Sequence, residues 1–240
     1  MKKILVSMLL VVSITSVYSQ SSPDSVLWDL VKTYRSLGGL SCDIQYKYAD
    51  EKGPAKYQDS LNGKYITQGA DAWYEIDHTI NIRNADYSIA IFEEDKIIYV
   101  GKSTQDRRIG DPLGAIDSLY KYDPGIHSTV KSVKDFWELT LNLPKNAGCK
   151  RIIYLIDKKS GLLMKTTAVV KKSMLFEPGS APADAKDEYS NIETIYTNYK
   201  IGNIDSAIFK TESYLSKESD EFKPSKKYDF YKIIKATPKL

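Results

Sequence analysis

AWYEIDHTINIRNADYSIAIFEEDKIIYV, residues Ala72 to Val100, is the stretch that decides the fold. Short runs of β-branched and aromatic residues follow one another in it, which is typical of β-strands. Two polar segments, Asn84-Ala85-Asp86 and Glu93-Glu94-Asp95, separate the runs and predict hairpin turns. We therefore expect the middle of an antiparallel sheet here.

The chain on either side of this stretch continues the pattern. Ser22-Pro23-Asp24 predicts the start of a helix, because a capping hydroxyl, a proline and an acid occupy its first positions. Apolar residues then recur at three- and four-residue spacing as far as Gly38-Gly39, so this helix needs one surface to cover. Further strands are predicted at 41–48, 57–67, 136–143, 150–157, 162–171, 191–200 and 228–235, a short helix between 111 and 124, and a loop at 176–186.

The first residues have the pattern of a secretory signal peptide. Lys2-Lys3 precede a short apolar run, and Val17 and Ser19 are small enough for the two positions that a signal peptidase reads. Cleavage after Ser19 would leave 240 − 19 = 221 residues. The nearest cysteine after that point is Cys42, so an acyl anchor on the mature amino terminus is not expected. We therefore expect an exported, soluble protein.

The charge balance excludes one class of partner. Without Lys2 and Lys3, the 34 basic residues become 32, against 31 acidic residues. So small an excess gives no support to nucleic-acid binding. Lysines gather in residues 216–240, which we interpret as a charged and solvated C-terminal extension.

No residue pattern indicates catalysis or a resident cofactor. The two histidines, His78 and His127, lie in no metal-binding motif, so neither a metal site nor a cofactor is expected. Nucleophile and phosphate-binding motifs are also absent from the sequence, and we do not expect an enzyme. Cys42 and Cys149 could form a disulfide in an oxidising compartment, and their spacing leaves this open.

Aromatic residues are the remaining signal. The chain has 18 tyrosines and 3 tryptophans. Tyrosine is amphipathic, so it suits a groove that is sometimes empty and sometimes filled, although it equally suits an ordinary sheet core.

The order of these segments resembles a known family. SCDIQYKY (41–48), GADAWYEI (69–76), SIAIFEEDKIIYV (88–100), YLIDKKSGLLMK (154–165) and IYTNYKIGNIDSAIF (195–209) follow an N-terminal amphipathic helix. This order is similar to that of the outer-membrane lipoprotein carrier, or LolA-like, family. Gln45 lies where the family often has a glutamine, whereas the arginine that some members carry before the third strand is not obvious here, the nearest polar position being Gln68.

The resemblance implies a fold and a function. The fold class is mainly β with helices (α+β), an unclosed antiparallel β half-barrel with covering helices that spans residues 20–215. The implied function is that of a monomeric carrier in the periplasm of a Gram-negative envelope. It would shield acyl chains of lipoproteins or other lipids, with transfer proteins of the inner and outer membranes as partners. By alternation, we expect the lipid-binding residues to be Ile44, Tyr46, Tyr74, Ile76, Ile89 and Ile91.

A second hypothesis remains open. The same fold with a filled core would serve as a protein-interaction or envelope-sensing module instead of a carrier. The carrier hypothesis requires that Ile76, Ile89 and Ile91 point into the groove, and a slip of one residue in a strand would turn its side chains to the other face.

Overall fold

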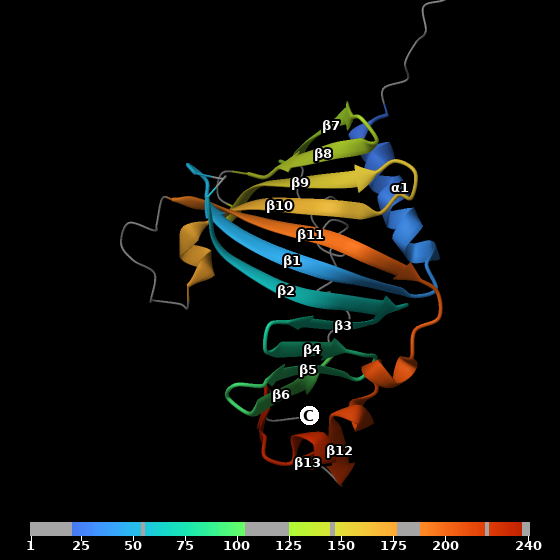
Figure 1. The fold of residues 1–240 in the computed structure, drawn as a ribbon, viewed down its shortest axis with the longest axis vertical. Helices are drawn as coiled ribbons and strands as arrows, with labels where there is room; N and C mark the ends of the chain where they lie inside the picture. The colour runs from blue at the N-terminus through green and yellow to red at the C-terminus, as the bar shows by residue number, and fades with distance from the viewer. Residues whose placement is uncertain are drawn as a thin grey trace, which may run out of the picture.

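The computed structural model of the chain describes residues 21–53, 56–103, 125–144, 147–176, 188–218 and 221–236. The predicted signal peptide, the helix expected between 111 and 124, and all but Phe176 of the expected loop lie outside these residues. In the described part, the chain forms one α-helix, α1 (Pro23–Ser36), and a large curved sheet (Figure 1).

The large sheet has twelve strands in the order β14-β6-β5-β4-β3-β2-β1-β11-β10-β9-β8-β7. All neighbours pair antiparallel except β14 and β6, which are parallel. Its strands are β1 (Leu40–Asp50), β2 (Tyr57–Gln68), β3 (Asp71–Ile76), β4 (Thr79–Arg83), β5 (Tyr87–Phe92), β6 (Ile97–Lys102), β7 (His127–Val133), β8 (Phe136–Asn142), β9 (Cys149–Asp157), β10 (Leu163–Lys171), β11 (Tyr189–Ile201) and β14 (Lys232–Lys235).

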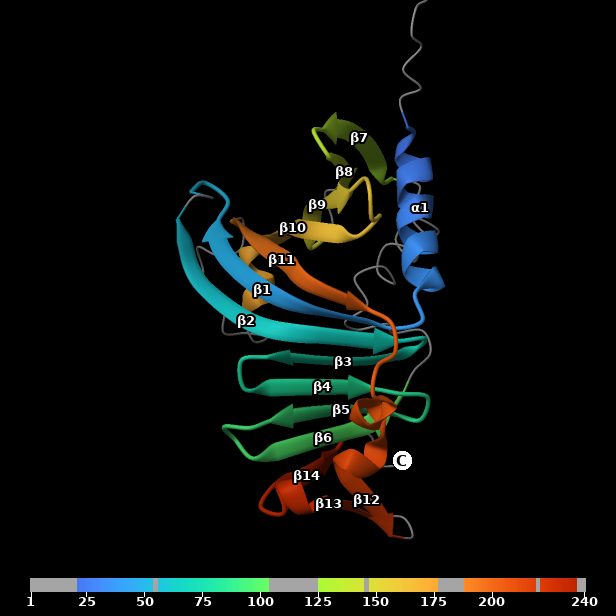
Figure 2. The same ribbon diagram turned by 45° about the vertical axis from the view of Figure 1, so that its right-hand side comes forward.

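Smaller elements lie beside this sheet. They are the hairpin of β12 (Leu215–Glu218) and β13 (Glu221–Pro224) and the 3₁₀ helices η1 (Lys172–Leu175), η3 (Ser206–Phe209), η4 (Thr211–Ser213) and η5 (Lys226–Tyr228). The sheet curves around α1 without closing, since among the described strands its two edges, β7 and β14, do not pair with each other (Figure 2). The predicted fold class, a mainly β protein with an unclosed antiparallel half-barrel, is confirmed.

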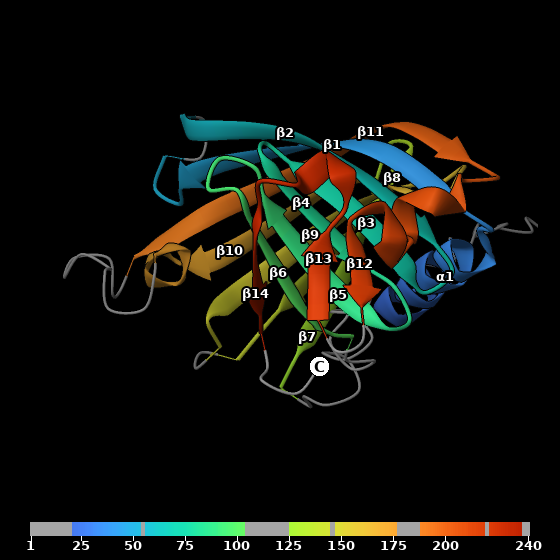
Figure 3. The same cartoon turned by 90° about the horizontal axis from the view of Figure 1, so that it is seen from below.

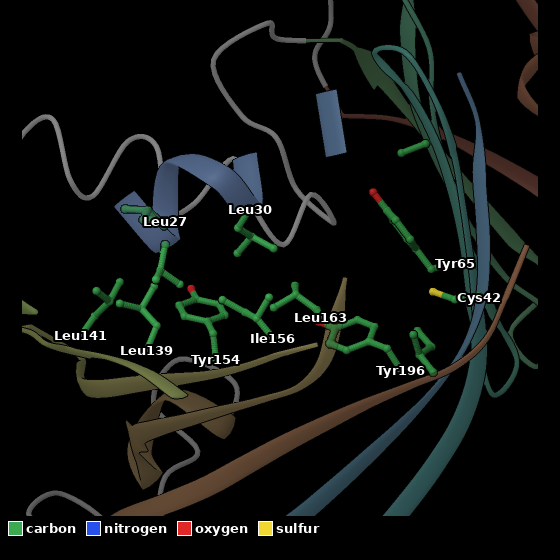
Figure 4. Packing of buried hydrophobic residues seen from close by; sticks show 13 residues of the cluster. Leu27, Leu30, Cys42, Tyr65, Leu139, Leu141, Tyr154, Ile156, Leu163 and Tyr196 are labelled. Carbon is green, nitrogen blue, oxygen red and sulfur yellow. The ribbon is translucent and has the colours of Figure 1, made fainter. Parts of the chain in front are cut away.

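Helix α1 begins and packs as its sequence predicts. The Ser22 side chain accepts a hydrogen bond from the Ser25 amide at 3.1 Å, and Pro23 takes the first helical position. The apolar face of α1 contacts β7 and β8. Figure 4 shows Leu27 and Leu30 of α1 above side chains of the sheet, with Tyr65 projecting from the wall formed by β1 and β2.

The side chains beneath α1 form the first core. They come from α1 and from one face of β1, β2, β3 and β8 to β11. Its buried members are Val26, Leu27, Leu30, Cys42, Ile44, Tyr65, Ala72, Leu139, Leu141, Tyr154, Ile156, Leu163 and Tyr196.

A second core lies on the opposite face of β2 to β6. Cross-strand pairing places its members on the same face: Trp73 of β3 pairs with Ile82 of β4, and Ile82 pairs with Ile89 of β5. The C-terminal segment covers this face, and Figure 3 shows β12 and β13 across the strands. Its buried members are Ile66, Trp73, Ile80, Ile82, Ile89, Ile91, Ile98, Val100, Phe209, Tyr214, Leu215, Phe222 and Tyr228.

The C-terminal segment thus differs from the solvated extension that we expected. Phe222 and Tyr228 are 8% and 2% exposed, and both belong to the second core. The predicted strand at 228–235 is present in shorter form as β14, which binds the edge of β6. The lysines of this segment mark its outer surface, while its few aromatic residues hold it to the sheet.

Candidate functional site

The face of the sheet that carries the first core continues beyond α1 toward the far ends of β1 and β2. Ile44, Tyr46 and Tyr48 alternate along β1 and point to this face. Tyr46 lies opposite Leu61 of β2, and Tyr48 lies opposite Ile192 of β11. An apolar surface therefore extends out of the core toward the β1–β2 turn.

A pocket of about 430 Å³ lies at this end of the sheet. Strands β1, β2 and β11 form one side of the pocket. Residues of η1, together with Phe176 just after it, form the other side. We call it the end pocket; it is lined by Tyr46, Lys47, Tyr48, Gln58, Asp59, Ser60, Leu61, Lys172, Leu175, Phe176 and Ile192. Its volume falls in the range of small-molecule sites, which is about 300–1,000 Å³.

The tyrosines of the pocket have partners for their hydroxyl groups. Ser190 donates a hydrogen bond to the Tyr48 hydroxyl at 3.1 Å. Burial raises the pKa of Tyr46, and a hydrogen bond with Thr194 partly opposes this rise. With the hydroxyl groups engaged, the rings offer mainly apolar surface to a ligand.

The charged groups at the pocket also have partners: Lys47 Nζ lies 4.9 Å from the centroid of the Tyr57 ring, and Asp59 accepts a hydrogen bond from the Ser60 amide at 2.7 Å. Lys172 Nζ lies 3.2 Å from Asp50 Oδ1 and 3.3 Å from Glu188 Oε2, and these two carboxylates raise the pKa of the ammonium. Gln58 donates a hydrogen bond to the other oxygen of Asp50 at 2.6 Å. Two ammonium groups, of Lys47 and Lys172, lie with three carboxylates, of Asp50, Asp59 and Glu188, so the pocket has no excess positive charge that would select an anion.

Apolar side chains remain exposed beside the pocket. Met174, Leu175 and Phe176 are 61%, 39% and 38% exposed, and Leu61 is 39% exposed. Leu61, Leu175 and Phe176 line the pocket, and three exposed large apolar residues at one pocket are more than the isolated examples that ordinary surfaces carry. Such groups mark interaction or ligand sites.

The structure brings together four of the six predicted lipid-binding residues. Ile44 belongs to the first core, and Tyr46, Tyr74 and Ile76 pack against it. Of these four, only Tyr46 also lines the end pocket. Whether they bind lipid stays a prediction.

Ile89 and Ile91 lie elsewhere, and the expectation that they share a face with Ile76 is wrong. They pair with Ile82 and Ile80 and are 1% and 0% exposed in the second core, on the opposite face of the sheet. Strand β3 has large apolar residues on both faces, so alternation within β3 does not show which of its faces is the one on which the isoleucines of β5 lie.

Sequence reasoning missed several pocket residues. Tyr48 was available as the next alternating position after Tyr46, and Ile192 faces the same side through its pairing with Tyr48. Leu175 and Phe176 had no such signal, because η1 reaches the pocket only through the tertiary fold.

The described residues offer little for catalysis or metal binding. In this part of the chain, no group of three or more His, Cys, Asp or Glu side chains is placed to hold a metal ion. His78 lies 3.6 Å from Asp77 and 3.8 Å from Glu94 at an exposed turn. Cys42 is buried and Cys149 is partly buried, and both thiols are free.

One finding bears on the membrane. Among the described helices, none has the length and apolar character needed to span a bilayer.

Comparison with known proteins finds similarity only among solved structures. No family model and no curated protein matches the chain. An uncharacterized conserved protein from Thermus thermophilus has a TM-score of 0.48 at 8% identity, over 88% of this chain and 98% of its own. A LolA superfamily protein from Nitrosomonas europaea has a TM-score of 0.38 at 9% identity, over 81% and 100%.

A third similar structure is a putative outer membrane lipoprotein-sorting protein domain from Vibrio parahaemolyticus. Its TM-score is 0.34 at 10% identity, over 78% of this chain and 95% of its own. Two of these three structures are described as a LolA superfamily protein and a lipoprotein-sorting domain. All three TM-scores are below 0.5, so the function has to be argued from the geometry of this chain.

Proposed function

We propose that this protein is a non-enzymatic binding protein that holds part of an acyl chain in the end pocket. The observation that carries the proposal is the pocket itself, a mainly apolar space of about 430 Å³ in which the two tyrosine hydroxyls and the Lys172 ammonium already have partners. A ligand gains little there from hydrogen bonds and much from leaving water. Linear hydrocarbon fits this description better than a sugar, a nucleotide or a peptide.

The energetics favour reversible binding. Each methylene group removed from water contributes about 0.8 kcal/mol, so five methylenes contribute about 4 kcal/mol before the costs of association. A chain that is only partly enclosed is therefore held without being trapped. A carrier needs this property, because release depends on a partner with a greater differential affinity.

The cellular setting belongs to the same proposal. The signal-peptide pattern of residues 1–19 supports export, and the LolA-like resemblance supports a soluble periplasmic carrier of lipoproteins or other lipids, working as a monomer toward the outer membrane. Transfer proteins in the two membranes would load and unload it. Residues 20–215 would form the carrier domain, with part of 216–240 completing its second core.

A second candidate function is favoured by the first core. Leu30 is 1% exposed, and Leu139, Leu141 and Leu163 are 0% exposed, so the region beneath α1 is filled by the chain itself. A protein-interaction module with a filled core would look the same there. The two functions differ at the end pocket, which a module of this kind does not need.

A fluorescent fatty-acyl probe tests the proposal with a matched pair of variants. Leu61→Arg places a long cation in the pocket at a position that is 39% exposed, and Val133→Arg makes the same change on β7 at a position that is 41% exposed. We expect Leu61→Arg to weaken probe binding by roughly tenfold or more, in line with the loss of about two buried methylenes. Val133→Arg should bind as the unmodified protein does.

Native mass spectrometry adds an independent readout. Protein purified from a lysate that contains membranes should carry lipid, and Leu61→Arg should carry less. Equal probe binding by the two variants, or no probe binding together with no co-purified lipid, would contradict the acyl-chain proposal and favour the interaction module.

A further inference from the structure

The 3₁₀ helix η1 forms one side of the end pocket with few attachments of its own. It follows β10 at the pocket end of the sheet (Figure 1), and none of its side chains is buried. Met174 lies against the backbone of Gly148, since a Cβ atom on that glycine would come within 2.1 Å of the Met174 sulfur, but Met174 is 61% exposed. Apolar burial is therefore incomplete throughout η1, and its position depends on other contacts as well.

Backbone hydrogen bonds fix the start of η1. The Lys171 amide donates to the Gly148 carbonyl at 2.7 Å, and the Lys172 amide donates to the Glu188 carbonyl at 2.9 Å. Gly148 directly precedes β9, and Glu188 directly precedes β11. These bonds do not reach β1 or β2, which belong to the opposite side of the pocket.

The side chain of Lys172 makes the connection to β1. Its ammonium lies 3.2 Å from Asp50, the last residue of β1, and 3.3 Å from Glu188. In the sheet, β11 lies between β10 and β1. The pair with Asp50 therefore links strands that are about 10 Å apart, because neighbouring strands lie about 4.8 Å from each other. Lys172 thus ties η1, across β11, to the strand that carries Tyr46.

Asp50 depends on this partner. Its Oδ2 atom accepts the hydrogen bond from Gln58 at 2.6 Å. Its Oδ1 atom is shielded from water and accepts no hydrogen bond within the part of the chain that the structure describes. A charged atom that is shielded from water is costly without a counter-charge, and the Lys172 ammonium supplies that charge.

The other charged groups beside this ion pair are matched. Lys150 Nζ lies 2.5 Å from Glu51 Oε1, and Lys52 Nζ lies 3.8 Å from Glu188 Oε1. Three carboxylates and three ammonium groups thus lie together, those of Asp50, Glu51 and Glu188 with those of Lys52, Lys150 and Lys172. An excess of one sign within this group does not oppose the pairing of Lys172.

We propose that Lys172 is a positioning residue of the end pocket: through its two ion pairs it holds Leu175 and Phe176 over the sheet. This inference rests on the proposed function, because it concerns the same pocket. An acyl chain is shielded from water on both sides only while η1 stays in place. The affinity for hydrocarbon therefore depends on ion pairs that the hydrocarbon itself does not form.

Ionic strength separates this role from apolar burial alone. Raising sodium chloride from about 0.01 M to about 1 M shortens the Debye length from about 30 Å to about 3 Å, which weakens ion pairs. Apolar burial is not an attraction between charges, and salts such as sulfate strengthen it. We therefore expect high sodium chloride to weaken the binding of an uncharged acyl probe by about threefold.

A fluorescent monoacylglycerol, whose headgroup carries no charge, is a suitable probe. Lys172→Gln should bind it about three- to fivefold more weakly than the unmodified protein does, and should lose the salt dependence. Lys172→Arg keeps a cation that can meet two carboxylates, and it should restore both properties. Lys165→Gln is the matched control, because Lys165 pairs with Glu193 at 2.6 Å and does not line the pocket, and its affinity should be unchanged.

Hydrogen exchange reports the position of η1 without any ligand. The peptide that contains residues 172–176 should exchange faster in Lys172→Gln than in the unmodified protein, and at an unchanged rate in Lys165→Gln. Glu188→Gln should change exchange and affinity in the same direction as Lys172→Gln, and it carries the test if Lys172→Gln fails to fold.

Two outcomes would overturn the positioning role. One is equal exchange and equal affinity in Lys172→Gln and the unmodified protein. The other is a weaker affinity with unchanged exchange, which would mean that Lys172 acts on the ligand directly. Faster exchange in Lys172→Gln, with no probe binding by any variant, would support the positioning of η1 and contradict the acyl-chain function instead.

Discussion

Tyr65 and Ile66 are consecutive residues of β2, and their side chains enter two different cores. Each is 7% exposed, Tyr65 beneath α1 and Ile66 beneath the C-terminal segment. Because successive side chains of a strand point to opposite faces, β2 is the strand through which both cores are joined. The half of the sheet that includes β7 to β11 is therefore covered by α1 on one face. The half that includes β3 to β6 is covered by the C-terminal segment on the opposite face.

The separation of the two cores predicts that stability and ligand binding can be uncoupled. Ile91→Ala removes a side chain that is 0% exposed in the second core, so we expect the free energy of unfolding to fall by about 2–5 kcal/mol. The acyl-probe affinity of the folded variant should be unchanged, since Ile91 faces away from the end pocket. Urea denaturation and probe titration below the transition measure the two quantities. A weakened affinity with unchanged stability would contradict this placement.

Gly63 predicts a steric effect where β2 and β3 approach closely. A Cβ atom at this position would lie 2.1 Å from the backbone oxygen of Glu75, so the strands would have to shift. We expect Gly63→Ala to lower the free energy of unfolding by about 1–3 kcal/mol. Gly38→Ala is the control, because nothing lies within 4 Å of its added atom, and its effect should stay within about 1 kcal/mol. Chemical denaturation of both variants tests the difference.

Glu193 predicts a component of stability that depends on pH. Burial would raise its pKa, but hydrogen bonds from Lys165 and Tyr57, at 2.6 and 2.8 Å, outweigh burial and hold the pKa below the ordinary value. Because the folded-state pKa is lower than the unfolded-state pKa of about 4.3, the ionised carboxylate stabilises the fold at pH values above about 4.3. This contribution is lost as the pH falls through the folded-state pKa. The stability advantage over Glu193→Gln should therefore shrink below about pH 5. A constant difference from pH 7 to pH 3 would refute this.

The two free thiols should differ in reactivity. Burial, helped by the charge of Asp43, raises the pKa of Cys42 to about 12, and its side chain is 1% exposed. Cys149 also has a raised pKa because of burial, but it is only partly buried. Since the thiolate is the reactive form, a disulfide-exchange reagent should modify Cys149 first and Cys42 only on unfolding. Cys149→Ser should remove the faster phase, and fast labelling in that variant would show that Cys42 is accessible.

The strands were predictable because alternation is a local property. Alternation predicts that Ile44 and Tyr46 share a face, and in the structure they lie on or against the first core. The relative faces of β3 and β5 were not predictable in the same way, because Trp73 and Tyr74 are both large and apolar and each fits a core. The face on which Ile89 lies follows only from two pairings: Ile89 pairs with Ile82, and Ile82 pairs with Trp73.

The role of the C-terminal segment and the pocket wall required the tertiary fold. Lysines dominate the composition after Leu215 and suggested a solvated extension, whereas Phe222 and Tyr228 decide that the segment packs on the sheet. Leu175 and Phe176 follow β10 in the chain but meet Tyr46 and Leu61 of other strands at the end pocket. The amino-acid composition of such a segment reflects its solvent-exposed residues. It does not indicate which distant residues the segment contacts.

The C-terminal segment also has a consequence for synthesis on the ribosome. Strands β3 to β6 emerge well before the residues that cover them, so the isoleucines of β4 and β5 and the open edge of β6 must wait in water or on a chaperone for η3, β13 and β14. A chain interrupted before Phe209 would display that surface permanently. That surface therefore stays open to aggregation from the emergence of β6 until β14 follows it.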